Sequence, residues 1–212
     1  MNILLLNSQK NNKYLSDLKK ILKDNKADRI NVCKSKLTIT NIKKLNPKVI
    51  ISFHYKYLIP IDVLKFINYR AFNFHNSYLP LNRGTYPVLW SAVSDKFASS
   101  LHKINKNIDD GDIVFRKEVR ISNNKTLFYA YHLLEKISLQ MFKKIWKKLR
   151  KKILHNKKMG FIKQNRNMIS YNNNFKSKIL LSSLPKKWMS KIKDVQLNHK
   201  MMFELLKQVE NY

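Results

Sequence analysis

The stretch AFNFHNSYLPLNRG, residues 71–84, decides the architecture expected of this 212-residue chain. It begins as an apolar run and ends in a segment rich in Pro, Asn and Gly, which favour turns. Residues two apart in a strand project from the same face, so Asn73 and His75 are expected to point together from a strand end. A strand that ends in polar groups and continues into a loop is typical of functional sites in α/β sheets.

A second stretch, LHKINKNIDDGDIV at residues 101–114, concentrates acidic side chains in a chain that has few of them. Three of the 13 Asp and Glu residues lie at positions 109–112. The chain has only 3 Gly, and two of them, Gly84 and Gly111, lie in these two stretches. Because Gly is used where the backbone needs positive φ or close approach, both loops are expected to have demanding geometry.

Apolar runs outside these stretches extend the pattern into an alternation of strands and helices. Residues 3–6 and 49–53 have the continuous apolar character of buried parallel strands. Residues 14–22 show helical spacing, and Pro60 and Pro87 are suited to open helices over residues 61–67 and 87–93. The alternation predicts an α/β fold with a Rossmann-like, mostly parallel twisted sheet and flanking helices.

The C-terminal half is expected to be mainly helical. Thr126 can cap a long amphipathic helix over residues 127 to about 153, whose far end is strongly basic. A strand over residues 168–171 and a last helix over about 188–209 follow. We therefore expect a catalytic domain at residues 1–158 and a short C-terminal extension at 159–212. The apolar stripe of the long helix is expected to consist of Leu134, Ile137, Met141, Ile145 and Leu149.

Charge and cysteine content restrict the class of protein. The 43 Lys and Arg residues give a formal net charge of +30, which favours either an anionic partner or an A/T-rich coding bias, and we favour the bias. No apolar run approaches the roughly 18 residues of a membrane span, and the N-terminal run lacks the basic leader of a signal peptide. The single Cys33 excludes an internal disulfide framework, so a cytoplasmic setting is expected.

The side chains of the two stretches suit acyl-type transfer. An Asn amide can donate to a developing oxyanion, a His can shuttle a proton, and an Asp can orient that His. Ser77 lacks the G-x-S-x-G context of an activated serine, which favours direct attack by a substrate amine. His54, His75 and His102 lack the spacing of a helical zinc motif, and D-D-G-D is too short for an EF-hand, so no metal site is expected.

Together, the two stretches resemble the signature of the folate-dependent formyltransferases. The resemblance lies in NFHNSYLP at residues 73–80, the Arg83-Gly84 pair, Pro87 and Trp90, and the second stretch through residue 113. It implies a Rossmann-like catalytic domain that uses N10-formyltetrahydrofolate, with Asn73, His75 and Asp109 as the catalytic trio. In that scheme an amine attacks the formyl carbon, Asn73 and protonated His75 stabilise the oxyanion, and Asp109 assists proton transfer.

The resemblance also implies where the folate binds. The matching pterin loop contains Tyr55, Lys56 and Leu58, and Asn105 and Asp109 lie on its other side. Much of this binding is expected to use backbone groups. Relatives often have an acidic pair where this chain has Asn105 and Lys106, so the folate loop is expected to differ in detail.

The pattern around Arg83 is most similar to the sugar N-formyltransferases. It implies an amino group on a nucleotide-linked deoxysugar as acceptor, with Arg83 as a candidate ligand of the diphosphate. One alternative is an enzyme like methionyl-tRNA formyltransferase, although about 50 residues after Gly160 are few for an RNA-binding barrel. Another is a basic nucleic-acid-binding module on the same fold. Nucleic acid is thus the less favoured partner, and a homodimer is an open alternative.

Overall fold

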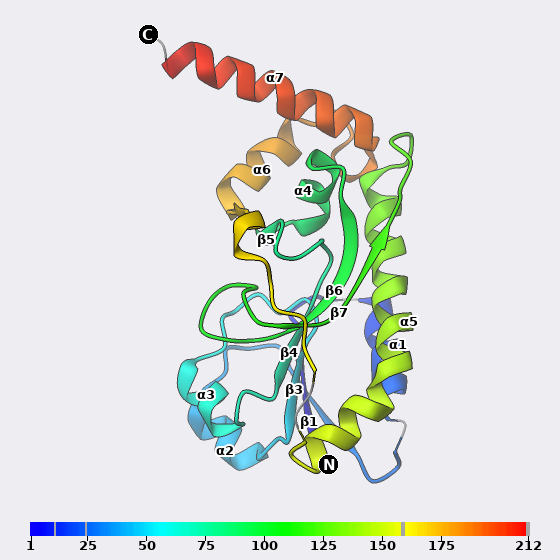
Figure 1. Cartoon of the computed structure of the whole chain (residues 1–212), viewed down its shortest axis with the longest axis vertical. Coiled ribbons are helices and arrows are strands. Elements are labelled where there is room, and N and C mark those ends of the chain that lie inside the picture. Colours follow the sequence, from blue (N-terminus) through cyan, green and yellow to red (C-terminus); the bar gives the residue numbers. More distant parts are fainter. Residues whose placement is uncertain (11, 24, 158–159, 211–212) are drawn as a thin grey trace. The chain divides into compact units, whose positions relative to one another are not determined.

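The central element of the computed structural model is a six-stranded mixed sheet (Figure 1). The structure describes residues 1–10, 12–23, 25–157 and 160–210. β1 pairs in parallel with β2 and β3, β3 pairs in parallel with β4, and β4 pairs antiparallel with β6. The predicted Rossmann-like, mostly parallel sheet is therefore confirmed. In sheet order the strands are β2 (Arg29–Cys33), β1 (Asn2–Leu6), β3 (Val49–Ser52), β4 (Ala71–His75), β6 (Phe97–Lys103) and β7 (Ile113–Val119).

Helices connect and follow these strands. The helix predicted at residues 87–93 has these same bounds in the structure, with Pro87 in its first turn. Thr126 caps the long helix as predicted, because its Oγ1 accepts a hydrogen bond from the backbone N–H of Tyr129 at 3.1 Å. The helices are α1 (Lys13–Leu22), α2 (Ile39–Leu45), α3 (Ile61–Phe66), α4 (Pro87–Val93), α5 (Leu127–Leu154), α6 (Asn174–Ser183) and α7 (Ile192–Glu210).

The chain forms two compact units by its internal contacts. Unit 1 comprises Met1–His75, Ser100–Phe115 and Lys136–Gln164, and unit 2 comprises Asn76–Ser99, Arg116–Glu135 and Asn165–Tyr212. β6, β7 and α5 each contribute residues to both units. The domain boundary expected between residues 158 and 159 lies outside the described residues.

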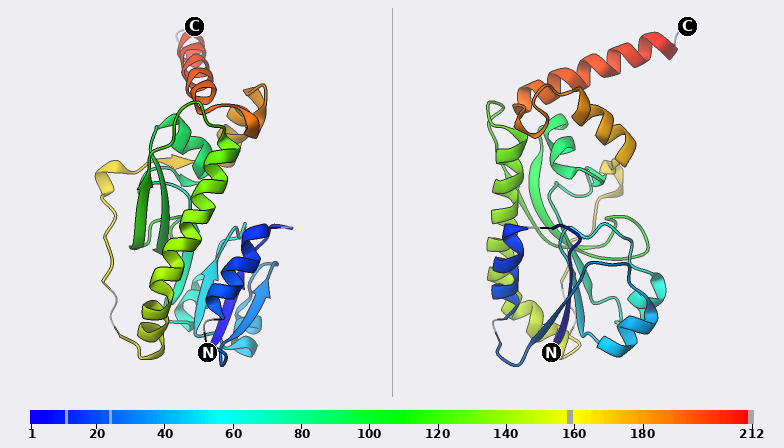
Figure 2. Two further views of the ribbon diagram at one scale, coloured as in Figure 1. Left: turned by 90° about the vertical axis from the view of Figure 1, so that its right-hand side faces the viewer. Right: turned by 180° about the vertical axis from the view of Figure 1, so that it is seen from behind.

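Unit 1 has an apolar core on each face of its strands. Ile3 and Leu5 of β1 pack with α1 and with residues 136–154 of α5. Leu4 and Leu6, which alternate with them, pack with α2 and α3. Figures 1 and 2 show α1 beside α5, and α2 and α3 on the other face of the strands. This three-layer arrangement explains the continuous apolar runs, because both faces of these strands are buried.

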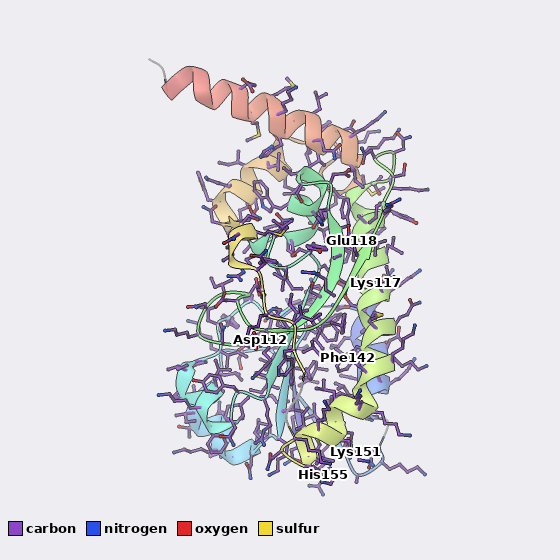
Figure 3. All side chains as sticks on the ribbon, in the orientation of Figure 1. Asp112, Lys117, Glu118, Phe142, Lys151 and His155 are labelled. Atoms are coloured by element: carbon purple, nitrogen blue, oxygen red, sulfur yellow. The ribbon has the colours of Figure 1, made fainter. Side chains whose placement is uncertain are left out.

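The stripe by which α5 packs agrees with the predicted one at Leu134 and Leu149, which are buried, and differs from it between them. Phe142 (labelled in Figure 3) and Trp146 are fully buried, whereas Met141 and Ile145 are only partly buried. The rings of Phe142 and Trp146 lie 5.2 Å apart between centroids. The packed face is therefore displaced by one residue from the predicted positions 141 and 145. The larger apolar area of the aromatic side chains accounts for this choice.

Unit 2 contains the segment that follows β4 and the C-terminal residues, which pair with each other through two short strands. The two-residue strand β5 (Arg83–Gly84) pairs in parallel with β8 (Tyr171–Asn172). Gly84 has φ +96°, and a Cβ there would lie 2.3 Å from the carbonyl oxygen of Asn172, so the prediction of demanding geometry holds. α4 packs against α6 and α7, and Trp90 Nε1 donates to Ser177 Oγ at 2.8 Å.

Two predictions for the C-terminal segment were wrong in detail. Residues 168–171 were expected to form a strand, but Arg166–Met168 is a short 3₁₀ helix (η1) and the strand begins at Tyr171. The side chain of Asn165 accepts from the N–H of Asn167 and so favours the turn. The last helix begins at Ile192, after a second 3₁₀ turn over Lys187–Met189 (η2). None of the described helices combines the length and apolar character needed to cross a membrane.

Candidate active site

The three side chains predicted to form the catalytic trio meet within unit 1. Asn73 and His75 lie two apart on β4, as the sequence predicts, and His75 is 5% exposed. Asp109 follows β6 in the acidic loop, where its φ of 49° places it in the left-handed region. Asp adopts this conformation more readily than most residues. The loop therefore turns its carboxylate back toward the end of β4.

The Asp109 carboxylate is the centre of the cluster. Its Oδ1 accepts from Asn73 Nδ2 at 3.3 Å and lies 3.3 Å from His102 Nε2, while its Oδ2 lies 3.5 Å from His75 Nδ1. The carboxylate is 12% exposed, so these neighbours replace much of its hydration. A carboxylate in this position orients the imidazole of His75 and stabilises its protonated form.

His102 is a member of the cluster that the sequence reasoning did not single out. It lies opposite Asn73 in the β4–β6 register and is 2% exposed. Its Nδ1 is 2.7 Å from the carbonyl oxygen of Lys103, which can only accept, so Nδ1 carries a proton. Its Nε2 lies 3.2 Å from Asn73 Nδ2. A neutral His102 thus accepts from Asn73, whereas a protonated His102 donates to Asp109.

The acidic loop is held in place by backbone and side-chain contacts. A Cβ at Gly111 would lie 1.9 Å from the carbonyl oxygen of Lys103, so only Gly fits this close approach. Gln164 Nε2 donates to the carbonyl oxygens of Asp109 at 2.9 Å and Gly111 at 2.7 Å. Gln164 was also missed, because no local sequence signal links it to a loop more than 50 positions earlier. These contacts fix the backbone from which the carboxylate projects.

The predicted folate-binding residues lie in two loops of unit 1. Leu58 is 74% exposed, and Lys56 is exposed beside it. Tyr55 donates its hydroxyl to the carbonyl oxygen of Ser35 at 2.7 Å. Burial, with a smaller contribution from nearby Cys33, raises the pKa of Tyr55 to about 12, so this hydroxyl keeps its proton. It anchors the loop and leaves the Leu58 side chain available to a ligand.

Asn105 takes part in the acidic loop. Its Nδ2 donates to Asp110 Oδ2 at 3.3 Å, and its Oδ1 accepts from the N–H of Asn107 at 2.9 Å. The remaining predicted residue, Arg83, lies on β5 in unit 2 and is 1% exposed. A role for Arg83 in substrate binding stays a prediction, and it requires an anion that reaches into the fold.

The fold and the cluster define an α/β enzyme for group transfer by acid–base and oxyanion chemistry. A formyl transferase family model matches residues 8–144, and the chain therefore belongs to the formyl transferase family. The resemblance drawn from the sequence is thereby confirmed.

Curated relatives match part of the chain. The bifunctional polymyxin resistance protein ArnA of Wigglesworthia glossinidia brevipalpis is 32% identical over 108 residues, which is 50% of this chain and 16% of ArnA. A methionyl-tRNA formyltransferase of Prochlorococcus marinus (strain AS9601) is 30% identical over 129 residues, which is 60% of this chain and 39% of that enzyme. The chain thus spans less than half the length of either relative.

One solved structure matches nearly end to end. The formyltransferase PseJ from Anoxybacillus kamchatkensis is 28% identical with a TM-score of 0.78, over 92% of this chain and 97% of PseJ. That structure is a complex with UDP-4,6-dideoxy-4-formamido-L-AltNAc and tetrahydrofolate.

Proposed function

We propose that the protein transfers the formyl group of N10-formyltetrahydrofolate to the amino group of a nucleotide-linked amino-deoxysugar. The Asp109 carboxylate, with Asn73 and His75 within 3.5 Å, is the observation that carries the reaction type. The likeness to PseJ, a protein complexed with a UDP-linked formamido sugar, supports the choice of acceptor. We place this reaction in the cytoplasm, as the sequence analysis expects.

The loops of unit 1 fit a folate. Leu58 offers an exposed apolar side chain for a flat ring, and Tyr55 holds its loop in place. The backbone around Lys56 and the amide of Asn105 supply polar groups on either side. These residues would hold the folate together with Asp109. When bound, N10-formyltetrahydrofolate supplies an activated formyl carbon.

His75 acts as the proton-transfer group in this proposal. Its Nδ1 faces Asp109, so the proton that it exchanges with the reacting amine is carried on Nε2. The carboxylate stabilises the imidazolium that results. As a cation, His75 also stabilises negative charge on the formyl oxygen.

Asn73 supplies a hydrogen bond to the same oxygen, and its neighbours hold the amide in position. The Asn73 Nδ2 atom lies within hydrogen-bond distance of Asp109 Oδ1 and of His102 Nε2. An amide that is held in this way needs little reorganisation to donate an N–H to the oxygen that gains charge.

A panel of acceptors tests the proposed function. The purified chain is given N10-formyltetrahydrofolate with dTDP-, UDP- and GDP-linked amino sugars, glycinamide ribonucleotide, or methionyl-tRNA, and tetrahydrofolate release is measured. We expect turnover with at least one nucleotide-linked sugar. Formylation of methionyl-tRNA alone would refute the sugar acceptor while leaving the trio in place.

Methionyl-tRNA remains the second candidate acceptor because two observations favour it. The relative from Prochlorococcus is a methionyl-tRNA formyltransferase. In addition, α5 exposes lysines at positions 143, 144, 147, 148 and 151, a surface suited to phosphates. Binding of tRNA that falls steeply with salt, together with formylation of methionyl-tRNA, would establish this alternative.

A further inference from the structure

A cluster of two cations around one aromatic ring lies in unit 2, and it shares no residue with the catalytic trio. The guanidinium carbon of Arg116 lies 3.8 Å from the centroid of the Tyr78 ring, and Lys96 Nζ lies 4.2 Å from it. The two positive charges are therefore no more than about 8 Å apart, because both lie close to one point. All three side chains, which we call the Tyr78 cluster, are half-buried.

The backbone around the Tyr78 cluster is well ordered by hydrogen bonds. Arg116 Nη1 donates to the carbonyl oxygen of Leu79 at 2.5 Å, and Ser77 Oγ donates to the carbonyl oxygen of Leu81 at 2.8 Å. The N–H of Lys96 donates to the carbonyl oxygen of Ser91 at 3.0 Å. The Arg116 guanidinium and the backbone at Lys96 are thus held in place before any ligand arrives, which lowers the entropic cost of binding.

The polar groups of the Tyr78 cluster have unused hydrogen-bonding capacity. Among the described residues, no carboxylate lies within 4.0 Å of Lys96 or Arg116, and neither the Lys96 ammonium nor the Tyr78 hydroxyl has a hydrogen-bond partner. Arg116 has five N–H donors and uses one of them on Leu79. The contrast with Arg150 is clear, because that guanidinium is paired with Asp28 through two hydrogen bonds. Two cations and a spare hydroxyl beside one ring therefore offer several hydrogen bonds to an anion.

We propose that the Tyr78 cluster binds the two phosphate groups of a nucleoside diphosphate. This inference rests on the proposed function and names the residues that select its substrate class. A guanidinium pairs with phosphate oxygens through parallel hydrogen bonds, and an ammonium adds a point charge beside it. Tyr78 belongs to the stretch 71–84 that the sequence analysis singled out, whereas buried Arg83 offers little surface.

The test compares charge-removing variants of the full chain. Lys96→Met removes one cation and keeps an apolar stem, and Tyr78→Phe removes only the hydroxyl. Lys117→Met is the matched control, because Lys117 is an exposed neighbour of Arg116 on β7 (Figure 3), and neighbouring residues of a strand face opposite sides. Isothermal titration calorimetry measures the binding of UDP, dTDP, GDP, inorganic pyrophosphate and tetrahydrofolate, and circular dichroism checks the fold of each variant.

We expect Lys96→Met to weaken the best nucleoside diphosphate by about tenfold or more, since it removes a charged hydrogen bond. Tyr78→Phe should weaken it by about threefold, and Lys117→Met by less than twofold. Tetrahydrofolate should bind equally to all of them, and pyrophosphate should compete with the nucleotide in the native protein. Unchanged nucleotide binding in Lys96→Met, or an equal loss of folate binding, would overturn the inference.

The failure of this inference is distinguishable from that of the proposed function. If the native protein formylates a nucleotide-linked amino sugar and Lys96→Met keeps the native acceptor KM, only the assignment to the Tyr78 cluster fails. If the native protein binds no nucleoside diphosphate and formylates a different acceptor, the proposed acceptor fails, and this inference fails with it.

Discussion

Replacement of Asp109 by Asn removes the negative charge at the centre of the candidate active site and changes little else. Asn tolerates the left-handed φ of 49° that position 109 adopts, so the loop should keep its conformation. At the observed 3.5 Å, the attraction between the carboxylate and protonated His75 is about 5 kcal/mol for an effective dielectric constant of about 20. In Asp109→Asn, reorganised solvent compensates for part of this lost attraction, which leaves a net loss of roughly 3 to 4 kcal/mol. We therefore expect kcat/KM to fall by a factor of about 100 to 1,000.

The assay follows tetrahydrofolate release over a range of pH in the native protein, Asp109→Asn and Asp112→Asn. Asp112 (labelled in Figure 3) lies in the same loop and is half-buried, so Asp112→Asn is the same chemical change outside the cluster. It should keep kcat/KM within about threefold of the native value. Equal unfolding midpoints would show that the fold is intact. An Asp109→Asn protein that is folded and as active as Asp112→Asn would refute the role given to the carboxylate.

Three further substitutions and one control test individual contacts of the structure. His102→Asn should lower kcat about tenfold with little change in either KM, because the ring no longer holds the active-site amide; an unchanged kcat in steady-state kinetics would contradict this. Gly111→Ala should lower the free energy of unfolding in urea by about 2 to 3 kcal/mol, since its Cβ would lie 1.9 Å from a carbonyl oxygen. Gly160→Ala, with nothing within 4 Å, should change it by less than about 0.5 kcal/mol, and equal effects would disprove the argument. Asp28→Asn should cost about 2 kcal/mol at neutral pH, because it leaves Arg150 without its carboxylate. Burial alone would raise the pKa of Asp28, but hydrogen bonds and charge from Arg150 and from the N-terminal ammonium of Met1 lower it below its ordinary 3.8. The difference in stability between the native protein and Asp28→Asn should therefore shrink as pH falls below about 4, and a difference that persists in acid would contradict the ion pairing.

Strong local patterns made much of the fold predictable. Continuous apolar runs marked β1 and β3, because strands buried on both faces carry mostly apolar residues, and an apolar run that ends in polar side chains marked β4. Proline in the first turn marked α4, and a threonine cap marked the start of α5. The pair formed by β5 and β8 was not predictable. Each strand has two residues, and their pairing joins Arg83 to Tyr171 without any local signal.

The candidate site was predictable in part for the same reasons. Asn73 and His75 could be placed together because strand periodicity alone puts residues two apart on one face. The contribution of His102 depends on its register opposite Asn73, which only the pairing of β4 with β6 reveals. On α5, Leu134 and Leu149 were predicted correctly, but Phe142 and Trp146 were missed. Aromatic side chains compete there with aliphatic ones one position away, and helical spacing accommodates either stripe.

The fate of an isotopically labelled formyl group tests the central claim most directly. The purified chain is incubated with N10-formyltetrahydrofolate labelled in its formyl carbon and with a nucleotide-linked amino-deoxysugar, and the products are identified by mass spectrometry. The account predicts that the label appears as an amide on the sugar nitrogen, in an amount equal to the tetrahydrofolate formed, and that His75→Ala forms this product at least about a hundredfold more slowly. Label that leaves only as formate, while the sugar stays unmodified, would contradict it.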